Sequence, residues 1–227
     1  MDFPPLLHQG SKIAIIAPAG KIKPNSLEEA INSLTSWGLE VVIGEHVYDQ
    51  DNYFSGKDAA RLSDLQWAVD DASIEAVLCA RGGYGITRIL PKIDFSYLRK
   101  NPKWIIGFSD ITALLLRLEI MNLAGIHGPM GISFNDHAYE VSLNSLHSML
   151  FKGSSSLVSN QGGISGTVTA RITGGNLSLI MDSLGTNNEI ETQGKILFIE
   201  EIGEDAYRVD RMFQQLLRAG KLRTWPA

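Results

Sequence analysis

Short apolar runs recur along the N-terminal part of the chain, and each is followed by a segment that can form a helix. A run of this kind, bounded by glycine or proline, is typical of a strand that is buried on both faces. Strands that alternate with helices at this spacing predict βαβ units, and therefore an α/β fold with a mostly parallel sheet and helices on both faces. The four runs are Ile13–Ala17, Val41–Ile43, Ala76–Ala80 and Trp104–Phe108.

The predicted helices lie between these runs. Ser26 and Glu29 have the spacing of a capping box at the start of the first helix, which Gly38 ends. A second helix is predicted over Lys57–Asp71. The segment Ile111–Leu118 is apolar almost all round, which predicts a buried helix directly after the fourth strand.

A small, polar segment interrupts the pattern near the middle of the chain. We therefore expect an N-terminal α/β domain over residues 1–151, a linker over 152–165 and a smaller β-rich domain over 166–227. In that second domain a half-exposed strand is predicted to stop at Gly174–Asn176, and Ile196–Ile199 predicts another strand. This part is small for an independent domain, so we expect it to lean on the first or to be incomplete.

Composition narrows the possible partners and the compartment. The 227 residues carry a formal net charge of -5 and no run of Lys or Arg, which argues against nucleic acid as a partner. The single cysteine, Cys79, lies inside an apolar run and suits a reducing compartment. No stretch approaches the roughly 18 apolar residues of a membrane span, so we expect a cytoplasmic protein with no membrane contact.

Ser109 is the leading candidate for a catalytic nucleophile. It follows the fourth predicted strand and precedes the buried helix, so it lies at the edge of the sheet where α/β folds bind ligands. A sharp turn at such a corner exposes a serine hydroxyl, and the amide of Asp110 could stabilise an oxyanion. Ser109 could equally cap the helix, because the turn lacks the second glycine of the G-x-S-x-G motif.

A glycine-rich turn, Arg81–Gly85, follows the third strand at the same edge. Its glycines let the backbone approach a ligand closely, so it could supply a second oxyanion N–H. A phosphate loop is the competing interpretation, but the Lys-Ser/Thr ending of a P-loop is absent. A purely structural turn is a third.

Carboxylates gather at the end of the last predicted strand, where Glu200 and Glu201 begin a run of four acids in six positions. Such a run is more often a solvated rim than a site. Loops at strand ends nevertheless tend to carry function, and a serine nucleophile needs a base oriented by a carboxylate.

Six motifs in this order resemble the S66 family of serine peptidases, which are the L,D-carboxypeptidases of murein peptides and their microcin-immunity relatives. The resemblance implies an N-terminal domain like that of class I glutamine amidotransferases, with the site in the groove between it and a β-rich C-terminal domain. An ordered set of this kind is more specific than any one member. The motifs are IAIIAPAG, ARGGYG, IIGFSDITALL, GIHGPM, TGGNLSL and ILFIEEIGEDAYRVDRM.

The resemblance assigns roles to individual positions. It places the nucleophile at Ser109, the triad glutamate at Glu200 with Glu201 as the alternative, and the oxyanion donors at the amides of Asp110 and Gly83. It implies no metal and no organic cofactor. It also implies a homodimer, and a murein peptide as the substrate.

The family's triad histidine lies in the later part of the C-terminal domain, beyond the segments matched here. We therefore expect the triad to be incomplete in these residues and turnover by them alone to be impaired. The implied reaction is removal of the terminal D-alanine from murein tetrapeptides in cell-wall recycling. A microcin-immunity peptidase and a non-catalytic murein-peptide binding module are the alternatives. The five histidines, all upstream of Glu200, are His8, His46, His127, His137 and His147.

Overall fold

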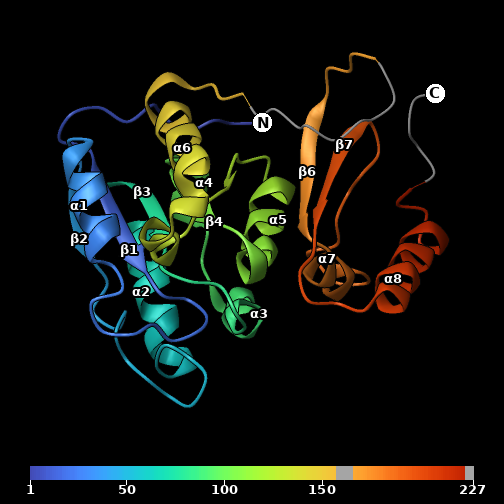
Figure 1. Ribbon diagram of the computed structural model, residues 1–227, viewed down its shortest axis with the longest axis horizontal. Coiled ribbons are helices and arrows are strands. Elements are labelled where there is room, and N and C mark those ends of the chain that lie inside the picture. The colour runs from blue at the N-terminus through green and yellow to red at the C-terminus, as the bar shows by residue number, and fades with distance from the viewer. Residues whose placement is uncertain (157–165, 223–227) are drawn as a thin grey trace. The chain divides into compact units, whose positions relative to one another are not determined.

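The computed structural model describes residues 1–156 and 166–222 (Figure 1). The chain forms two compact units, Met1–Ser156 and Leu157–Ala227. The first is an α/β unit with a parallel sheet flanked by helices, and the second holds a smaller sheet, so the predicted fold class is confirmed. Most of the predicted linker, residues 157–165, lies outside the described residues.

The sheet of the first unit has five strands in the order β2-β1-β3-β4-β5, and all neighbouring strands are parallel. The chain passes from β1 to β2 on one side and then returns to add β3 on the other side of β1. Ligands bind α/β sheets at such a switch in direction, at the carboxyl ends of the strands. The strands are β1 (Lys12–Ile16), β2 (Glu40–Ile43), β3 (Ile74–Cys79), β4 (Trp104–Gly107) and β5 (Ile126–His127).

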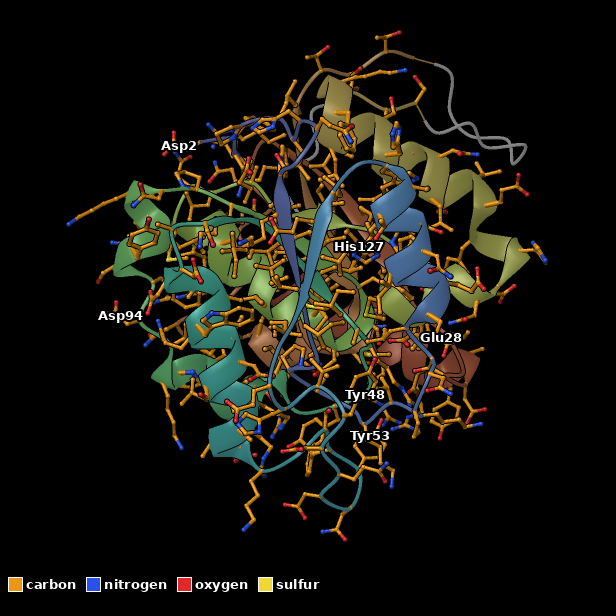
Figure 2. The ribbon with its side chains drawn as sticks, turned by 90° about the vertical axis from the view of Figure 1, so that its left-hand side faces the viewer. Asp2, Glu28, Tyr48, Tyr53, Asp94 and His127 are labelled. Carbon is orange, nitrogen blue, oxygen red and sulfur yellow. The ribbon has the colours of Figure 1, made fainter. Side chains whose placement is uncertain are left out.

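Helices cover both faces of this sheet, as Figure 2 shows. On one face, α1 and α6 share a hydrophobic cluster with the strands, in which Leu34 and Leu146 pack with Ile15 and Leu78. On the other face, α2 contacts β1 and β3. The helices of this unit are α1 (Glu28–Ser36), α2 (Asp58–Asp70), α3 (Ile86–Ile89), α4 (Ser96–Lys100), α5 (Thr112–Ile120) and α6 (Glu140–Lys152), with 3-10 helices at Leu90–Lys92, Ser109–Ile111, Gly131–Asn135 and His137–Tyr139.

The second unit contains β6 (Arg171–Asn176) and β7 (Lys195–Glu200), which pair in parallel, and the helices α7 (Leu177–Ser183) and α8 (Ala206–Arg218). The predicted break at Gly174 is wrong, because β6 continues to Asn176. Gly174 and Gly175 have φ values of +133° and +136°, and a Cβ on Gly174 would lie 1.8 Å from the carbonyl oxygen of Phe198. The glycines therefore allow β7 to approach closely instead of ending β6.

The predicted capping box is also wrong. Helix α1 begins at Glu28 with Leu27 at the N-cap, and the Ser26 hydroxyl donates to the Lys23 carbonyl oxygen, 2.8 Å away. The helix begins one residue later than a capping box at Ser26 requires. The Ser26 hydroxyl therefore donates to a backbone carbonyl in the preceding turn. Across the described parts of both units, no helix is long and apolar enough to cross a membrane.

Candidate active site

Ser109 has a left-handed backbone, with φ at +59°. The other non-glycine residues with positive φ in the described chain are all asparagines, which tolerate this conformation better than serine does. Such strain persists only where the surrounding structure imposes it, and it clusters at functional sites. Here the strain lies at the carboxyl end of β4, the position of a nucleophile elbow.

The tight corner depends on Gly107, the last residue of β4. A Cβ on Gly107 would lie 2.9 Å from both Cγ atoms of Ile111. The absent side chain lets Ile111 pack directly over the end of the strand. Gly107 thus provides the space where the end of β4 meets Ile111. This explains how the turn forms without the second glycine of the G-x-S-x-G motif.

The Ser109 hydroxyl does not cap a helix. The 3-10 helix Ser109–Ile111 has Phe108 at its N-cap and α5 has Ile111, and neither N-cap side chain accepts a capping hydrogen bond. Ser109 is half-buried, and within the described residues its Oγ makes no hydrogen bond. A hydroxyl at a strand end that takes no part in capping is in the position of a nucleophile, which still needs a base to activate it.

The glycine turn lies against Ser109. A Cβ on Gly82 would be 3.1 Å from the Ser109 Cβ and 3.3 Å from its Oγ. The Gly82 carbonyl also accepts a hydrogen bond of 3.0 Å from the Gly20 amide, which follows β1. The glycine turn therefore lies at the carboxyl ends of β1 and β3, where the strand order reverses, and it is adjacent to Ser109.

Gly83 has a φ of +108°, and a Cβ there would lie 2.6 Å from the Tyr53 hydroxyl oxygen. Tyr53 is half exposed and lies in the lower part of the view in Figure 2. Only glycine combines this φ with so close an approach of a tyrosine. An aromatic side chain thus borders the candidate oxyanion donor.

Asp110 is almost fully buried at 1% exposure, and its Oδ2 accepts a hydrogen bond of 2.9 Å from the Ile86 amide. From the sequence, only its backbone amide was assigned a role. Arg61 is a second residue whose role was not predicted: its side chain is buried and donates to the Gly85 carbonyl. Its spacing of four from Leu65, which places both on the buried face of α2, is a signal that was open to sequence reasoning.

Glu200 and Glu201, in the second unit, differ sharply in their partners. Glu201 accepts hydrogen bonds from the Ser178 amide (3.0 Å) and hydroxyl (2.6 Å), so it holds the first turn of α7. Burial alone would raise the pKa of Glu201, but these bonds and those from Ile202 and Asn176 bring it below its ordinary value. Glu201 is therefore engaged in the fold.

Glu200 ends β7 and is half-buried. Burial raises the pKa of Glu200 above its ordinary value, and the negative charge of Glu201 raises it further. A hydrogen bond from Asn176 lowers the pKa but does not cancel this rise. One carboxylate oxygen, Oε1, is buried and has no hydrogen-bond partner among the described residues. Glu200 is thus the acid of the pair that remains available to a new partner.

None of the five histidines donates to or accepts from the Ser109 hydroxyl within the described residues. His46 contacts Asp49 at 3.0 Å, and His147 packs between Trp37 and Phe151. His127 lies on β5 opposite Gly107, and burial lowers its pKa to about 4. His127 is therefore neutral at physiological pH, which suits a structural role in the fold.

Arg81 donates to the Lys21 carbonyl at 2.8 Å and so ties the glycine turn to the loop after β1. Across residues 1–156 and 166–222, no cluster of three or more His, Cys, Asp or Glu side chains could hold a metal ion. The chemistry that the site offers is that of a serine hydroxyl beside backbone amides.

Comparison with protein families agrees with this geometry. The model of the LD-carboxypeptidase N-terminal domain, peptidase family S66, matches residues 13–128, and the model of the C-terminal domain matches residues 169–227. The chain belongs to the LD-carboxypeptidase family. This family of serine-type carboxypeptidases therefore accounts for both units, and the resemblance seen in the motifs is confirmed.

Curated relatives support the same assignment. A Bacillus subtilis protein named "Probable murein peptide carboxypeptidase" is 38% identical over 232 residues, covering 96% of this chain and 71% of the relative. The murein tetrapeptide carboxypeptidase of Pseudomonas aeruginosa is 36% identical over 220 residues, covering 92% of this chain and 72% of the relative.

Solved structures share the fold. The muramoyltetrapeptide carboxypeptidase of Oxalobacter formigenes has a TM-score of 0.82 at 31% identity and covers 93% of this chain and 72% of its own. An MccF-like protein from Bacillus anthracis has a TM-score of 0.85 at 26% identity, covering 96% and 76%. The LD-carboxypeptidase fold thus extends over both units of this chain.

Proposed function

We propose that this LD-carboxypeptidase removes the terminal D-alanine from murein tetrapeptides, in cell-wall recycling. The observation that carries the proposal is the left-handed backbone of Ser109 beside the glycine turn. The names of the relatives from Bacillus subtilis and Pseudomonas aeruginosa support murein peptides as the substrate class.

In the proposed reaction the Ser109 Oγ attacks the carbonyl carbon of the bond to D-alanine. The amides of Asp110 and Gly83 stabilise the oxyanion, and D-alanine leaves as the C–N bond breaks and its nitrogen takes up a proton. Water then hydrolyses the acyl-enzyme and frees Ser109. These steps need no metal and no organic cofactor.

A histidine is the proposed base, with Glu200 orienting its ring and stabilising the imidazolium. Glu200 is favoured over Glu201 because the Glu201 carboxylate already holds α7. His127 is a poor candidate, since burial keeps it neutral and lowers its basicity. Because no histidine forms a hydrogen bond with the Ser109 hydroxyl within the described residues, we expect turnover by residues 1–227 to be on the order of 10⁴-fold or more below that of a complete triad.

The test measures D-alanine released from a murein tetrapeptide by the protein expressed from its whole reading frame and by residues 1–227. We expect release by the former, its loss in Ser109→Ala, and little release by the latter. Robust release by residues 1–227 that Ser109→Ala abolishes would show that another base serves. Release that survives Ser109→Ala would refute the proposed nucleophile.

Two further arms separate the alternatives. Faster cleavage of an aminoacyl-nucleotide peptide than of the tetrapeptide would favour a microcin-immunity activity, which the likeness to the MccF-like fold keeps open. Binding of the tetrapeptide without hydrolysis would favour a binding module. We also propose a cytoplasmic homodimer, to be tested by cell fractionation and by light scattering of the purified protein.

A further inference from the structure

The peptide unit that joins Gly85 to Ile86, at the end of the glycine turn, is held from both sides. Its carbonyl oxygen accepts a hydrogen bond of 2.9 Å from Arg61 Nη1. Its N–H donates a hydrogen bond of 2.9 Å to Asp110 Oδ2. One side chain comes from α2 and the other from the serine turn, so a single peptide plane links two distant segments.

Both side chains are buried, at 1% exposure each, and both belong to ionisable residues. Hydrogen bonds to charged groups are stronger and more directional than neutral ones, and the low dielectric of the interior strengthens them further. Arg61 also donates to the Pro18 carbonyl at 2.7 Å and pairs with Asp58. Arg61 therefore joins the loop after β1 to the glycine turn.

The turn needs such a restraint. Gly83 and Gly85 adopt φ values of +108° and +140°, and glycine reaches many other conformations at little cost. A Cβ on Gly85 would lie 2.5 Å from Arg61 Nη1, so the guanidinium occupies the space beside the glycine backbone. Without the two side-chain bonds, the longer 3.3 Å bond from the Arg88 amide would remain on this peptide unit, and its rotation would reorient the amides before it.

We propose that Arg61 and Asp110 are positioning residues, which fix the Gly85–Ile86 peptide plane and thereby hold the Gly83 amide in register with Ser109. This inference rests on the proposed function, because it assumes that Gly83 stabilises an oxyanion. An oxyanion forms only during reaction, so misplacing its donor lowers kcat and leaves KM largely unchanged. The carboxylate of Asp110 thus acts separately from its amide.

Arg88 provides a matched control. It pairs with the same Asp58 at 2.9 Å and, like Arg61, lies over the Phe54 ring. Its side chain is exposed and its guanidinium donates to Asp58, whereas only its backbone amide donates to the Gly85 carbonyl, at 3.3 Å, a bond that Arg88→Lys retains. Comparing substitutions at Arg61 and Arg88 therefore separates the effect of disturbing the Asp58 ion pair from the effect of losing the restraint on the Gly85–Ile86 peptide.

The experiment uses the protein expressed from the whole reading frame and measures kcat and KM. Near-ultraviolet circular dichroism gives the folded fraction of each variant, to which kcat is normalised. The variants are Asp110→Asn, Asp110→Leu, Arg61→Lys and Arg88→Lys. Asp110→Leu should lower kcat by roughly 10²–10³-fold, the range for loss of one oxyanion donor, with KM changed less than about threefold. Asp110→Asn retains an acceptor oxygen and should recover most of the loss. Arg61→Lys should lower kcat at least tenfold, and Arg88→Lys less than threefold.

Equal activity of Asp110→Asn and Asp110→Leu, a loss confined to KM, or equal effects at Arg61 and Arg88 would overturn the inference. Should Asp110→Leu fail to fold, the comparison of Arg61→Lys with Arg88→Lys decides alone. The rate of Ser109 labelling by a fluorophosphonate gives the same ranking without any murein substrate. Wild-type labelling without tetrapeptide turnover would therefore refute the proposed substrate and still test the restraint.

Discussion

Ser109 and His127 are single residues near the candidate site whose conformation or burial affects the free energy of unfolding. Ser109 adopts a backbone conformation that costs an L-residue roughly 1–2 kcal/mol, and the surrounding turn imposes it. His127 lies one strand away and is kept neutral by burial. The strain at Ser109 therefore reduces stability, and the burial of His127 reduces it at pH values below 6.5.

Replacing Ser109 should separate strain from chemistry. Ser109→Ala and Ser109→Gly should both abolish turnover, but Ser109→Gly should be the more stable by about 1 kcal/mol because glycine accepts positive φ. Urea denaturation measures the difference. Ser63, exposed in the middle of α2, is the control, where glycine should be less stable than alanine by about 0.5–1 kcal/mol. The same order at both positions would contradict the strain at Ser109.

Protonation of His127 should make stability depend on pH. Its pKa falls from 6.5 to about 4 on folding, so between these values the unfolded chain binds a proton that the folded chain does not. The free energy of unfolding should therefore rise from pH 4 to 6.5, with about 1–3 kcal/mol due to this residue. His127→Gln should reduce that slope, whereas the exposed His137→Gln should leave it unchanged. Identical slopes for both variants would refute the assignment.

At the scale of elements, strand ends carry the candidate residues of each unit. The ends of β1, β3 and β4 bring the glycine turn against Ser109, and the end of β7 carries Glu200 beside α7. Parallel pairing places these ends at one edge of each sheet. The close crossings at Gly82, Gly107 and Gly174 then set how tightly the segments meet.

The two acids at the end of β7 should respond in opposite ways to removal of charge. Glu200→Gln should lower kcat on the order of 10⁴-fold, as for loss of a triad carboxylate, without lowering stability, because burial disfavours its charged form. Glu201→Gln should lower stability by about 1–3 kcal/mol, since it removes a charged acceptor at the start of α7. Turnover and urea midpoints of both variants provide the test, and reversed effects would make Glu201 the triad acid.

At the scale of the whole molecule, the first unit contains a complete core. Its hydrophobic cluster runs from Leu7 to Leu150 and draws on the sheet, α1 and α6. The chain leaves this unit at Ser156. The residues of this cluster thus all lie within the first unit.

Residues 1–156 should accordingly fold alone and unfold cooperatively in urea, because the cluster buries its apolar surface without the second unit. Circular dichroism across a urea titration checks this. Ile106→Asp, which puts a charge into the same cluster, should abolish the transition. A non-cooperative transition in the unsubstituted fragment would show that the second unit is needed for folding.

Much of the fold could be predicted from local sequence because its strands are continuous apolar runs and its main helices are periodic. The errors arose where local and tertiary effects compete. The sequence predicts a strand break at Gly174, but in the structure the glycine lets β6 lie close to the Phe198 carbonyl. The sequence predicts a cap at Ser26, but the helix begins later and the Ser26 hydroxyl donates to Lys23 instead. Short elements such as α3 and β5 carry too little periodicity to predict.

The sequence by itself determined the α/β class, the family and the position of Ser109, since these depend on patterns along the chain. Only the tertiary structure decided between Glu200 and Glu201 as the available acid, and only it revealed the carboxylate of Asp110 and the guanidinium of Arg61 on one peptide plane. The physical reason is that hydrogen-bond partners and burial depend on segments far apart in sequence. The backbone strain that those distant segments impose on Ser109 supports its proposed role as the nucleophile.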